Sequence, residues 1–395
     1  MLHLMYTKYL MFLFISVFLI EFELVAQKFD TLPSTFKIIK LNPYTSIKNQ
    51  YRSSTCWSFT AISLIESDLI KEGKGKFNLS EMFIVRQAYM DKAEKYIRMH
   101  GSITFGGGGT LSDPIDIIKK YGIVPANVYS GLVNGQTRYV HSEMDVALKS
   151  YVDSVINNKK VLPIWKEGFT LLLDRYLGKL PDKFRFNNTE YTAISYANML
   201  GINWNNYILL SSFCNKPYYQ KSVVEVPDNW SWGAAYNLPL VDFKEVIDSA
   251  INSGYTIAIA TDVSEKGFMW DKGLALADND PDNEFESTIN PSMWIPRKDT
   301  SAVPYIEIEI NPLMRQQAFD NYETTDDHSM QIVGLAVDNF GKQYYVTKNS
   351  WGTEYTLYNG ILYISGAFLM YKTITLLVNK NSVPSKILKK LDFKE

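Results

Sequence analysis

Residues 50–59 read QYRSSTCWSF, and Cys56 within this stretch is one of only two cysteines in the 395-residue chain. From Cys56 onward, apolar residues recur at a spacing that predicts a buried amphipathic helix ending near Gly73. The positions are Phe59, Ile62, Leu64, Ile65 and Leu69. The first turn of a helix carries partial positive charge, which stabilises a thiolate. Cys56 at the start of this helix is therefore a candidate nucleophile.

The second cysteine, Cys214, lies in the stretch LLSSFCNKPYY. We predict that it is a small buried apolar residue. At most one disulfide could form, and a reactive Cys56 must stay free. The fold is therefore expected to depend on its core and not on cross-links.

Helical patterns dominate the first half of the chain, and strand patterns dominate the second. The helical character continues to about residue 210, with Ser80 as a possible N-cap of the helix after it, and one more helix is predicted at 240–254. Strands are predicted at 255–263, 305–310, 330–337, 342–348, 360–365 and 373–379. This division predicts an α+β protein with two lobes, and a cleft between lobes is a common place for an active site.

A thiol becomes a good nucleophile when a base takes its proton, and histidine is the usual base. Of the four histidines, His3 belongs to a predicted leader, whereas His100 and His141 lie in polar stretches typical of a surface. His328 opens the strand-like run HSMQIVGLAV, which would hold its ring in a fixed direction. Asn349, 21 residues later in KNSWG, could accept a hydrogen bond from an N–H of that ring, and Trp351 could shield the bond from water.

Each of these signals is weak when it is taken alone. A single cysteine before a tryptophan is usually a packing feature, a histidine at a strand start is usually structural, and NSWG could be an ordinary turn. The ordered set is much more specific. Gln50 precedes Cys56 by six residues at a helix start, and His328 and Asn349 follow at strand ends.

This ordered set resembles the papain-like cysteine peptidases. The stretches QYRSSTCWSF, NLSE, the glycines before KKYGIVP, DHSMQIVGLAV and YYVTKNSWG occur in that family's order. Within the family the sequence is most similar to the bleomycin hydrolase and aminopeptidase C branch. The features shared with that branch are SSTCWSF without a second cysteine, an insert at about 137–235, TDVSEKGF with KGLALAD, and LLVNKNSVP. The resemblance covers roughly residues 45–385.

The resemblance implies roles for individual residues. Cys56 would be the nucleophile, His328 the general base and acid paired with it as thiolate and imidazolium, and Asn349 the residue that orients His328. Gln50 and the backbone N–H of Cys56 would stabilise the oxyanion. Substrate-binding roles would fall to the backbones of Gly108 and Gly109 and to Trp351; for the two glycines, a merely flexible loop is an equal alternative. No cofactor is implied.

The sequence patterns and the resemblance together predict a division of the chain, in which the signal peptide is a departure from the mostly cytoplasmic related branch. We expect a signal peptide at residues 1–26, a helical lobe with the nucleophile at 27–136, a helical insert at 137–235, a β-rich lobe with the histidine and asparagine at 236–384, and a C-terminal tail at 385–395. In the related branch the C-terminus lies in the cleft and limits the enzyme to N-terminal residues. Here the tail SKILKKLDFKE looks shorter, so aminopeptidase and endopeptidase activity both stay open. A homo-oligomer is possible, because members of that branch form hexamers.

The N-terminus and the composition limit where the protein acts and on what. The apolar run YLMFLFISVFLI is too short to span a bilayer comfortably and precedes Ala26, which predicts a cleaved signal peptide, no stable membrane anchor after cleavage and a secreted or periplasmic protein. The net charge of -2 argues against nucleic acid as a partner. The acidic stretch 278–284 lacks the glycine and glutamate of a calcium loop, because Asn283 and Ile289 stand in their places.

These observations predict an exported papain-like cysteine peptidase that hydrolyses peptides through a thioester acyl-enzyme. The alternative is a catalytically silent binding or scaffolding protein that keeps the fold. The complete set of Cys56, His328, Asn349 and Gln50 favours the enzyme.

Overall fold

The structure is a computed structural model that describes residues 35–158, 160–277, 307–391 and 393. The predicted signal peptide at 1–26 and the acidic stretch at 278–284 lie outside these residues. Within the described ranges, no helix is long and apolar enough to cross a membrane.

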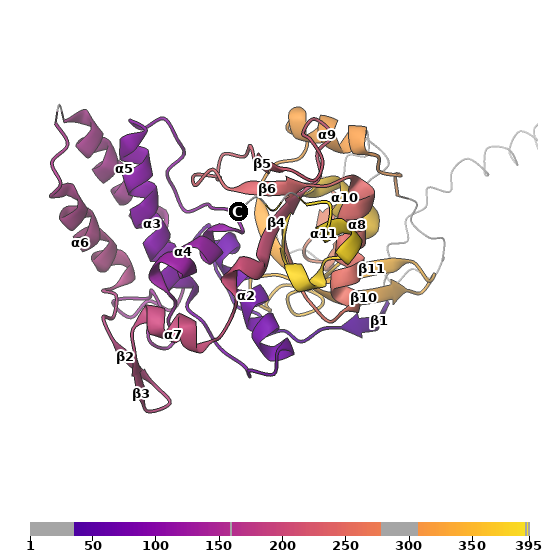
Figure 1. Ribbon diagram of the computed structural model, residues 1–395, viewed down its shortest axis with the longest axis horizontal. Helices are drawn as coiled ribbons and strands as arrows, with labels where there is room; N and C mark the ends of the chain where they lie inside the picture. Colours follow the sequence, from indigo (N-terminus) through magenta and orange to yellow (C-terminus); the bar gives the residue numbers. More distant parts are fainter. Residues whose placement is uncertain (1–34, 159, 278–306, 392, 394–395) are drawn as a thin grey trace, which may run out of the picture.

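The helical lobe is built from six helices, shown in indigo to magenta in Figure 1. They are α2 (Cys56–Lys71), α3 (Glu81–Arg98), α4 (Asp113–Tyr121), α5 (Ser142–Asn157), α6 (Trp165–Leu177) and α7 (Ala193–Met199). The predicted cap is confirmed, because the Ser80 side chain accepts a hydrogen bond from the backbone N–H of Phe83 at 3.0 Å. A small hairpin of β2 (Phe184–Phe186) and β3 (Thr189–Tyr191) precedes α7.

The second lobe is organised around one mixed sheet. Its strands follow the order β5-β6-β4-β13-β7-β10-β11-β12-β9-β8, and β1 pairs with β10. Their bounds are β1 (Phe36–Leu41), β4 (Tyr207–Ser211), β5 (Lys221–Val223), β6 (Ala234–Asn237), β7 (Ile257–Thr261), β8 (Phe268–Met269), β9 (Leu274–Ala275), β10 (His328–Asp338), β11 (Gln343–Lys348), β12 (Ile361–Ser365) and β13 (Thr373–Asn379). The helices α8 (Leu240–Asn252), α9 (Pro312–Asp320), α10 (Gly366–Lys372) and α11 (Ser385–Leu388) belong to this lobe, with short 3₁₀ turns at Trp204–Asn206 and Lys380–Ser382.

Two stretches differ from the predicted secondary structure. Residues 207–211, expected to close a helical region, form β4, whose side chains are all buried between β13 and β6. A short apolar run such as YILLS fits a buried strand as well as a helix, so periodicity could not decide between them. Conversely, the described part of 305–310, residues 307–310, is not a strand despite its alternating pattern.

Helix α2 lies between the two lobes (Figure 1) and joins them through polar contacts. The Thr60 hydroxyl donates to the Ser329 carbonyl at 2.8 Å, and Gln331 on β10 bonds to Ser63 and Ser67 of α2. Farther along α2, the buried carboxylate of Asp68 accepts bonds from Tyr207 and Asn379 of the sheet. These polar contacts between α2 and the sheet, here called the seam, fix the start of α2 against the start of β10.

Strand β1 lies at an edge of the sheet. It pairs antiparallel with β10, and no other strand of the described chain pairs with it. Ile38, Ile39 and Leu41 on this strand are exposed. The edge therefore presents apolar side chains and backbone groups on its outer side.

The C-terminal tail is packed on the β-rich lobe. Ile387 of α11 and Leu391 are buried in the same apolar cluster as α8, and the ring of Phe393 contacts that of Tyr236 with 5.2 Å between centroids. Lys390 pairs with Asp242 on α8. The described residues of the tail, 385–391 and 393, are thus an integral part of this lobe.

Candidate active site

Cys56 is the first residue of α2 and is half-buried, with a free thiol. The loop before it is tightly folded, because Tyr51 and Ser54 adopt the left-handed conformation at φ 50° and 55°. Residues without a glycine's freedom take up this conformation at an energetic cost, which is often found at functional sites. The loop therefore aims the N-terminus of α2, and Cys56 with it, at the β-rich lobe.

The other cysteine lies elsewhere and is exposed. Cys214 follows β4 in a surface loop, so the prediction that it is a small buried apolar residue is wrong. The apolar run before it belongs to β4, and the chain leaves the core just before Cys214. Its free thiol is a convenient internal control for the reactivity of Cys56.

His328 and Asn349 meet because β10 and β11 are antiparallel neighbours. His328 is the first residue of β10, and Asn349 follows the last residue of β11. The His328 Nε2 atom lies 2.7 Å from Asn349 Oδ1, and both residues are buried. The Trp351 ring covers this bond, with 4.5 Å between the Trp351 and His328 ring centroids.

The Cys56 thiol lies against the same strand end. The backbone N–H of Ser329, the residue after His328, is close enough to the thiol to lower its pKa, although burial outweighs this and raises the Cys56 pKa to about 12. Burial likewise lowers the pKa of His328 to about 4, against the opposing effect of its bond to Asn349. Charging either group alone in this dry site is therefore unfavourable.

Gln50 is held beside this pair from the other side. Its backbone N–H donates to the Ser350 carbonyl at 2.8 Å, and its side-chain oxygen accepts a bond from the Ser350 hydroxyl at 2.7 Å. Because the oxygen end of the amide is occupied, the NH₂ end is the one left for another acceptor. Such a donor near a nucleophile is suited to a developing oxyanion.

The glycine stretch before α4 is packed closely on α2 and α3. The Trp57 indole donates to the Gly107 carbonyl at 2.9 Å, and the buried Lys92 ammonium donates to the carbonyls of Gly106 and Gly108. A Cβ at Gly109 would lie 2.9 Å from the Trp57 ring. Glycine is needed here because the backbone approaches its neighbours closely, and not because the loop has to be flexible.

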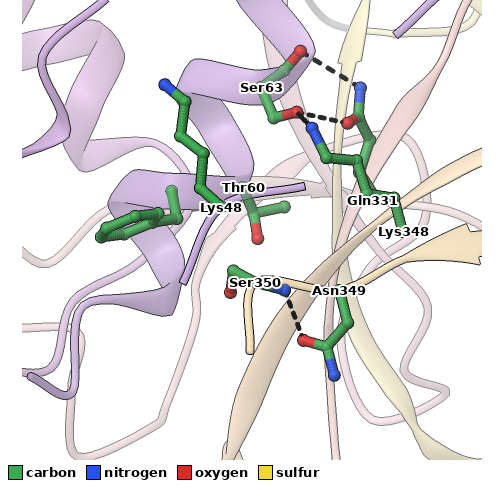
Figure 2. Close-up of a pocket in the computed structure, with 8 residues that line it drawn as sticks. Lys48, Thr60, Ser63, Gln331, Lys348, Asn349 and Ser350 are labelled. Carbon is green, nitrogen blue, oxygen red and sulfur yellow. Dashed lines mark hydrogen bonds between the residues drawn. The ribbon is translucent and has the colours of Figure 1, made fainter. Parts of the chain in front are cut away.

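Behind Asn349 lies a polar pocket that sequence reasoning missed. Figure 2 shows Ser63 bonded to Gln331 and Lys348, with Asn349 and Ser350 below them. Lys348 donates to the Ser63 hydroxyl at 2.6 Å, and burial lowers the pKa of its ammonium to about 8. The only available signal was the presence of polar residues on the buried faces of a helix and a strand.

No group of three or more His, Cys, Asp and Glu side chains in the described parts of the chain is placed to hold a metal ion. The chemistry that these residues can carry out by themselves is nucleophilic attack by Cys56 with His328 as proton carrier.

Comparison with known proteins agrees with this geometry. Residues 313–367, which contain His328 and Asn349, match the family described as papain family cysteine protease. The chain is 23% identical to aminopeptidase C of Lactobacillus delbrueckii subsp. lactis, over 88% of this chain and 82% of the relative. It is 22% identical to aminopeptidase C of Streptococcus thermophilus, over 85% and 80%.

A solved structure supports the fold. The crystal structure of PepW from Lactobacillus rhamnosis HN001 superposes with a TM-score of 0.69 at 18% identity, covering 90% of this chain and 85% of that chain. The two-lobed α+β arrangement is therefore papain-like, as expected from the sequence. The family match at residues 313–367 and the relatives of similar length indicate a cysteine-type peptidase of the papain family C1, and the solved structure shows the fold.

Proposed function

We propose that this peptidase removes residues from the free N-terminus of peptides, with Cys56 as its nucleophile. The observation that carries the proposal is the bond between His328 and Asn349 at the end of β10, against which the Cys56 thiol lies. The similarity to proteins named aminopeptidase C favours action at N-termini.

The reaction begins with transfer of the Cys56 proton to His328. Each charge alone is disfavoured by burial, as the raised thiol pKa and the lowered imidazole pKa indicate. Proton transfer creates both charges at once, and their attraction at close range offsets much of the desolvation. The N-terminus of α2 adds further support for the thiolate.

The thiolate then attacks the carbonyl carbon of the scissile bond. The carbonyl oxygen becomes an oxyanion that accepts hydrogen bonds from Gln50 Nε2 and the backbone N–H of Cys56. Loss of one such donor typically costs about 3 kcal/mol of transition-state stabilisation. The C–N bond breaks as imidazolium returns its proton to the leaving amine. Water, deprotonated by His328, then hydrolyses the thioester, and the proton returns to the Cys56 sulfur.

The test compares Cys56→Ala with Cys214→Ala. We expect Cys56→Ala to lose at least about 1,000-fold in kcat/KM on aminoacyl-aminomethylcoumarin substrates, whereas Cys214→Ala keeps normal activity. Mass spectrometry of products from a long peptide, with a free or an acetylated N-terminus, distinguishes stepwise trimming from internal cuts. Full activity of Cys56→Ala would disprove the proposed nucleophile, and internal cuts in the acetylated peptide would disprove the restriction to N-termini.

We also propose that the protein is exported after removal of residues 1–26. The support is the short apolar run followed by Ala26 in the sequence. Mass spectrometry of the protein purified from the cells that produce it naturally would give a mature N-terminus at Gln27. Retention of Met1 would contradict export by a cleaved signal.

A further inference from the structure

A hairpin loop of the β-rich lobe reaches the helical lobe at the glycine stretch. Residues 224–233 connect β5 and β6, and Figure 1 shows this hairpin extending toward α3 and α4. The buried Trp230 of the loop donates its indole N–H to Asp113 at 2.8 Å, and Lys95 of α3 lies over the Trp232 ring at 3.6 Å. Asn229 ties the two sides of the loop together through bonds to Val224 and Gly233.

This rigid loop places the Asp228 carboxylate directly on Gly108. A Cβ added to Gly108 would overlap the carboxyl group of Asp228, so a side chain at this position would force that carboxylate to move. Gly108 is one of the two glycines whose backbone is expected to face the substrate. A carboxylate from one lobe therefore stands against the proposed substrate wall of the other.

A second carboxylate, that of Asp326, belongs to the segment that leads into β10. Asp326 precedes His328 by two residues, and its charge acts on both the Cys56 thiol and the carboxyl of Asp228. Burial and the repulsion by Asp228 and Asp327 raise the pKa of Asp326 to about 7. The adjacent Asp327 is different, because it accepts hydrogen bonds from Ser264 and Thr325.

The local charges are not balanced. Neither Asp228 nor Asp326 forms an ion pair with any residue in the described ranges. The charge of Lys92 acts on Asp228, but the Lys92 ammonium is bound to the carbonyls of Gly106 and Gly108 and is shared electrostatically with Asp113 and Asp145. A cationic group between Asp228 and Asp326 would relieve both their repulsion and the cost of their burial.

We infer that Asp228 and Asp326 bind the free α-ammonium group of the peptide substrate and thereby set the cut one residue from its N-terminus. This inference rests on the proposed function of Cys56. Asp326 is two residues from His328, and one residue spans at most about 3.5 Å, so the backbone of Asp326 lies within about 7 Å of the base that serves Cys56. An ammonium held by Asp326 would thus belong to the residue whose carbonyl Cys56 attacks. The same carboxylates could instead receive a basic side chain one residue further upstream.

The experiment measures kcat/KM for alanyl-aminomethylcoumarin and its N-acetyl derivative with Asp228→Asn and Asp326→Asn. A hydrogen bond to a charged group contributes about 1.5–3 kcal/mol, so each variant should lose about 10- to 100-fold on the free amine. The acetylated substrate should change less than about threefold by the same reasoning. Glu225→Gln is the matched control, since Glu225 lies in the same loop but pairs on the surface with Lys216.

The rate of Cys56 alkylation by iodoacetamide shows that Asp228→Asn keeps an intact site, even if the acetylated substrate is not turned over. In Asp326→Asn the alkylation rate should rise, because the charge of Asp326 disfavours the thiolate. Equal losses on both substrates, or an unchanged ratio, would overturn the inference. A second result would also overturn the inference. If the variants lost only the wild-type preference for acetyl-Arg-Ala over acetyl-Ala-Ala coumarin amides, the carboxylates would bind a basic side chain and not the α-ammonium group. Activity in Cys56→Ala would refute the proposed function. If Cys56→Ala is inactive but Asp228→Asn keeps the wild-type ratio of kcat/KM on free and acetylated substrates, only this inference is refuted.

Discussion

His328 is buried, and the free energy of its imidazolium depends on the few atoms around it. Asn349 Oδ1 is 2.7 Å from the ring, and this bond raises a pKa that burial lowers to about 4. Asn349 does not need to touch the substrate to matter. It acts as a positioning residue that fixes the direction of the ring and favours its protonated form.

We therefore expect Asn349→Ala to reduce kcat by about 100-fold, the range in which a misplaced general base becomes ineffective. The diagnostic measurement is the pH profile of Cys56 alkylation by iodoacetamide. Without the acceptor the imidazolium is less stable, so the thiolate forms less readily and the profile shifts to higher pH. An unchanged profile with reduced kcat would assign Asn349 a purely structural role.

Asp326 predicts a pH dependence of stability with a definite sign. Its folded-state pKa, about 7, lies above the ordinary value of 3.8, so the folded protein binds this proton more tightly than the unfolded chain. The charged form therefore lowers the free energy of unfolding above pH 7, by up to about 4 kcal/mol, and the penalty disappears as the pH falls toward 4. Thermal denaturation of Asp326→Asn should show a higher Tm than wild type at pH 8 and little difference at pH 4.

Asp327→Asn is the control, because its expected change in Tm at neutral pH has the opposite sign. The hydroxyl and backbone groups of Ser264 and the hydroxyl of Thr325 favour its charged form and hold the pKa of Asp327 below its usual value despite burial. This contribution to stability is present above about pH 4 and is lost in acid. Asp327→Asn should therefore lower the Tm at neutral pH. A rise in Tm for both variants would refute this account.

Sequence reasoning identified the residues that lie at the ends of regular elements. Cys56 and His328 each begin an element with a clear hydrophobic pattern, so their partners could be proposed from order alone. Asp228 and Asp326 could not be found in this way. Their proximity depends on a loop that crosses from one lobe to the other, and no local pattern encodes that crossing.

At the scale of elements, the contact between α2 and β10 determines how accurately the site is assembled. Gln331 is fully buried in this contact, and its amide bonds to the side chains of Ser63, Ser67 and Thr256. Since Cys56 begins α2 and His328 begins β10, any slip between the two elements would change the separation of thiol and ring. The polar network therefore supports the site without touching substrate.

Gln331→Ala should lower the free energy of unfolding by about 3 kcal/mol, because it leaves a small cavity and unpaired hydroxyl groups. Urea denaturation measures this change. Gln317→Ala, on the exposed side of α9, is the control and should change stability by less than about 0.5 kcal/mol. Equal effects of the two substitutions would show that the network does not stabilise the seam.

Helices and strands could be predicted where the hydrophobic pattern in the sequence was long. They could not be predicted where this pattern was short. The helix at 240–254 and the strands around 330–337, 342–348 and 373–379 were found, because several periods of the pattern support each one. The β4 strand, five buried residues long, was missed. Its neighbours in the sheet, β13 and β6, lie far away in the sequence, so local periodicity contains no trace of the pairing.

At the scale of the whole molecule, the C-terminal tail stabilises the β-rich lobe. Removal of residues 385–395 would expose the apolar surface that Ile387 and Leu391 now cover, and should lower the free energy of unfolding by about 3–5 kcal/mol. The preference for a free amine should persist in this truncated protein, because Asp228 and Asp326 belong to other segments. Thermal denaturation and the ratio of rates on free and acetylated substrates provide the two measurements; loss of the preference would instead assign amine recognition to the tail.

The outer edge of β1 has a consequence for how the protein behaves in concentrated solution. An unpaired strand carrying Ile38, Ile39 and Leu41 is a template onto which the same strand of a second molecule can add. Lys37 and Lys40 are interspersed among these apolar residues, and their like charges repel such an approach. High salt screens this repulsion, so self-association of the purified enzyme should increase with ionic strength and begin at residues 36–41.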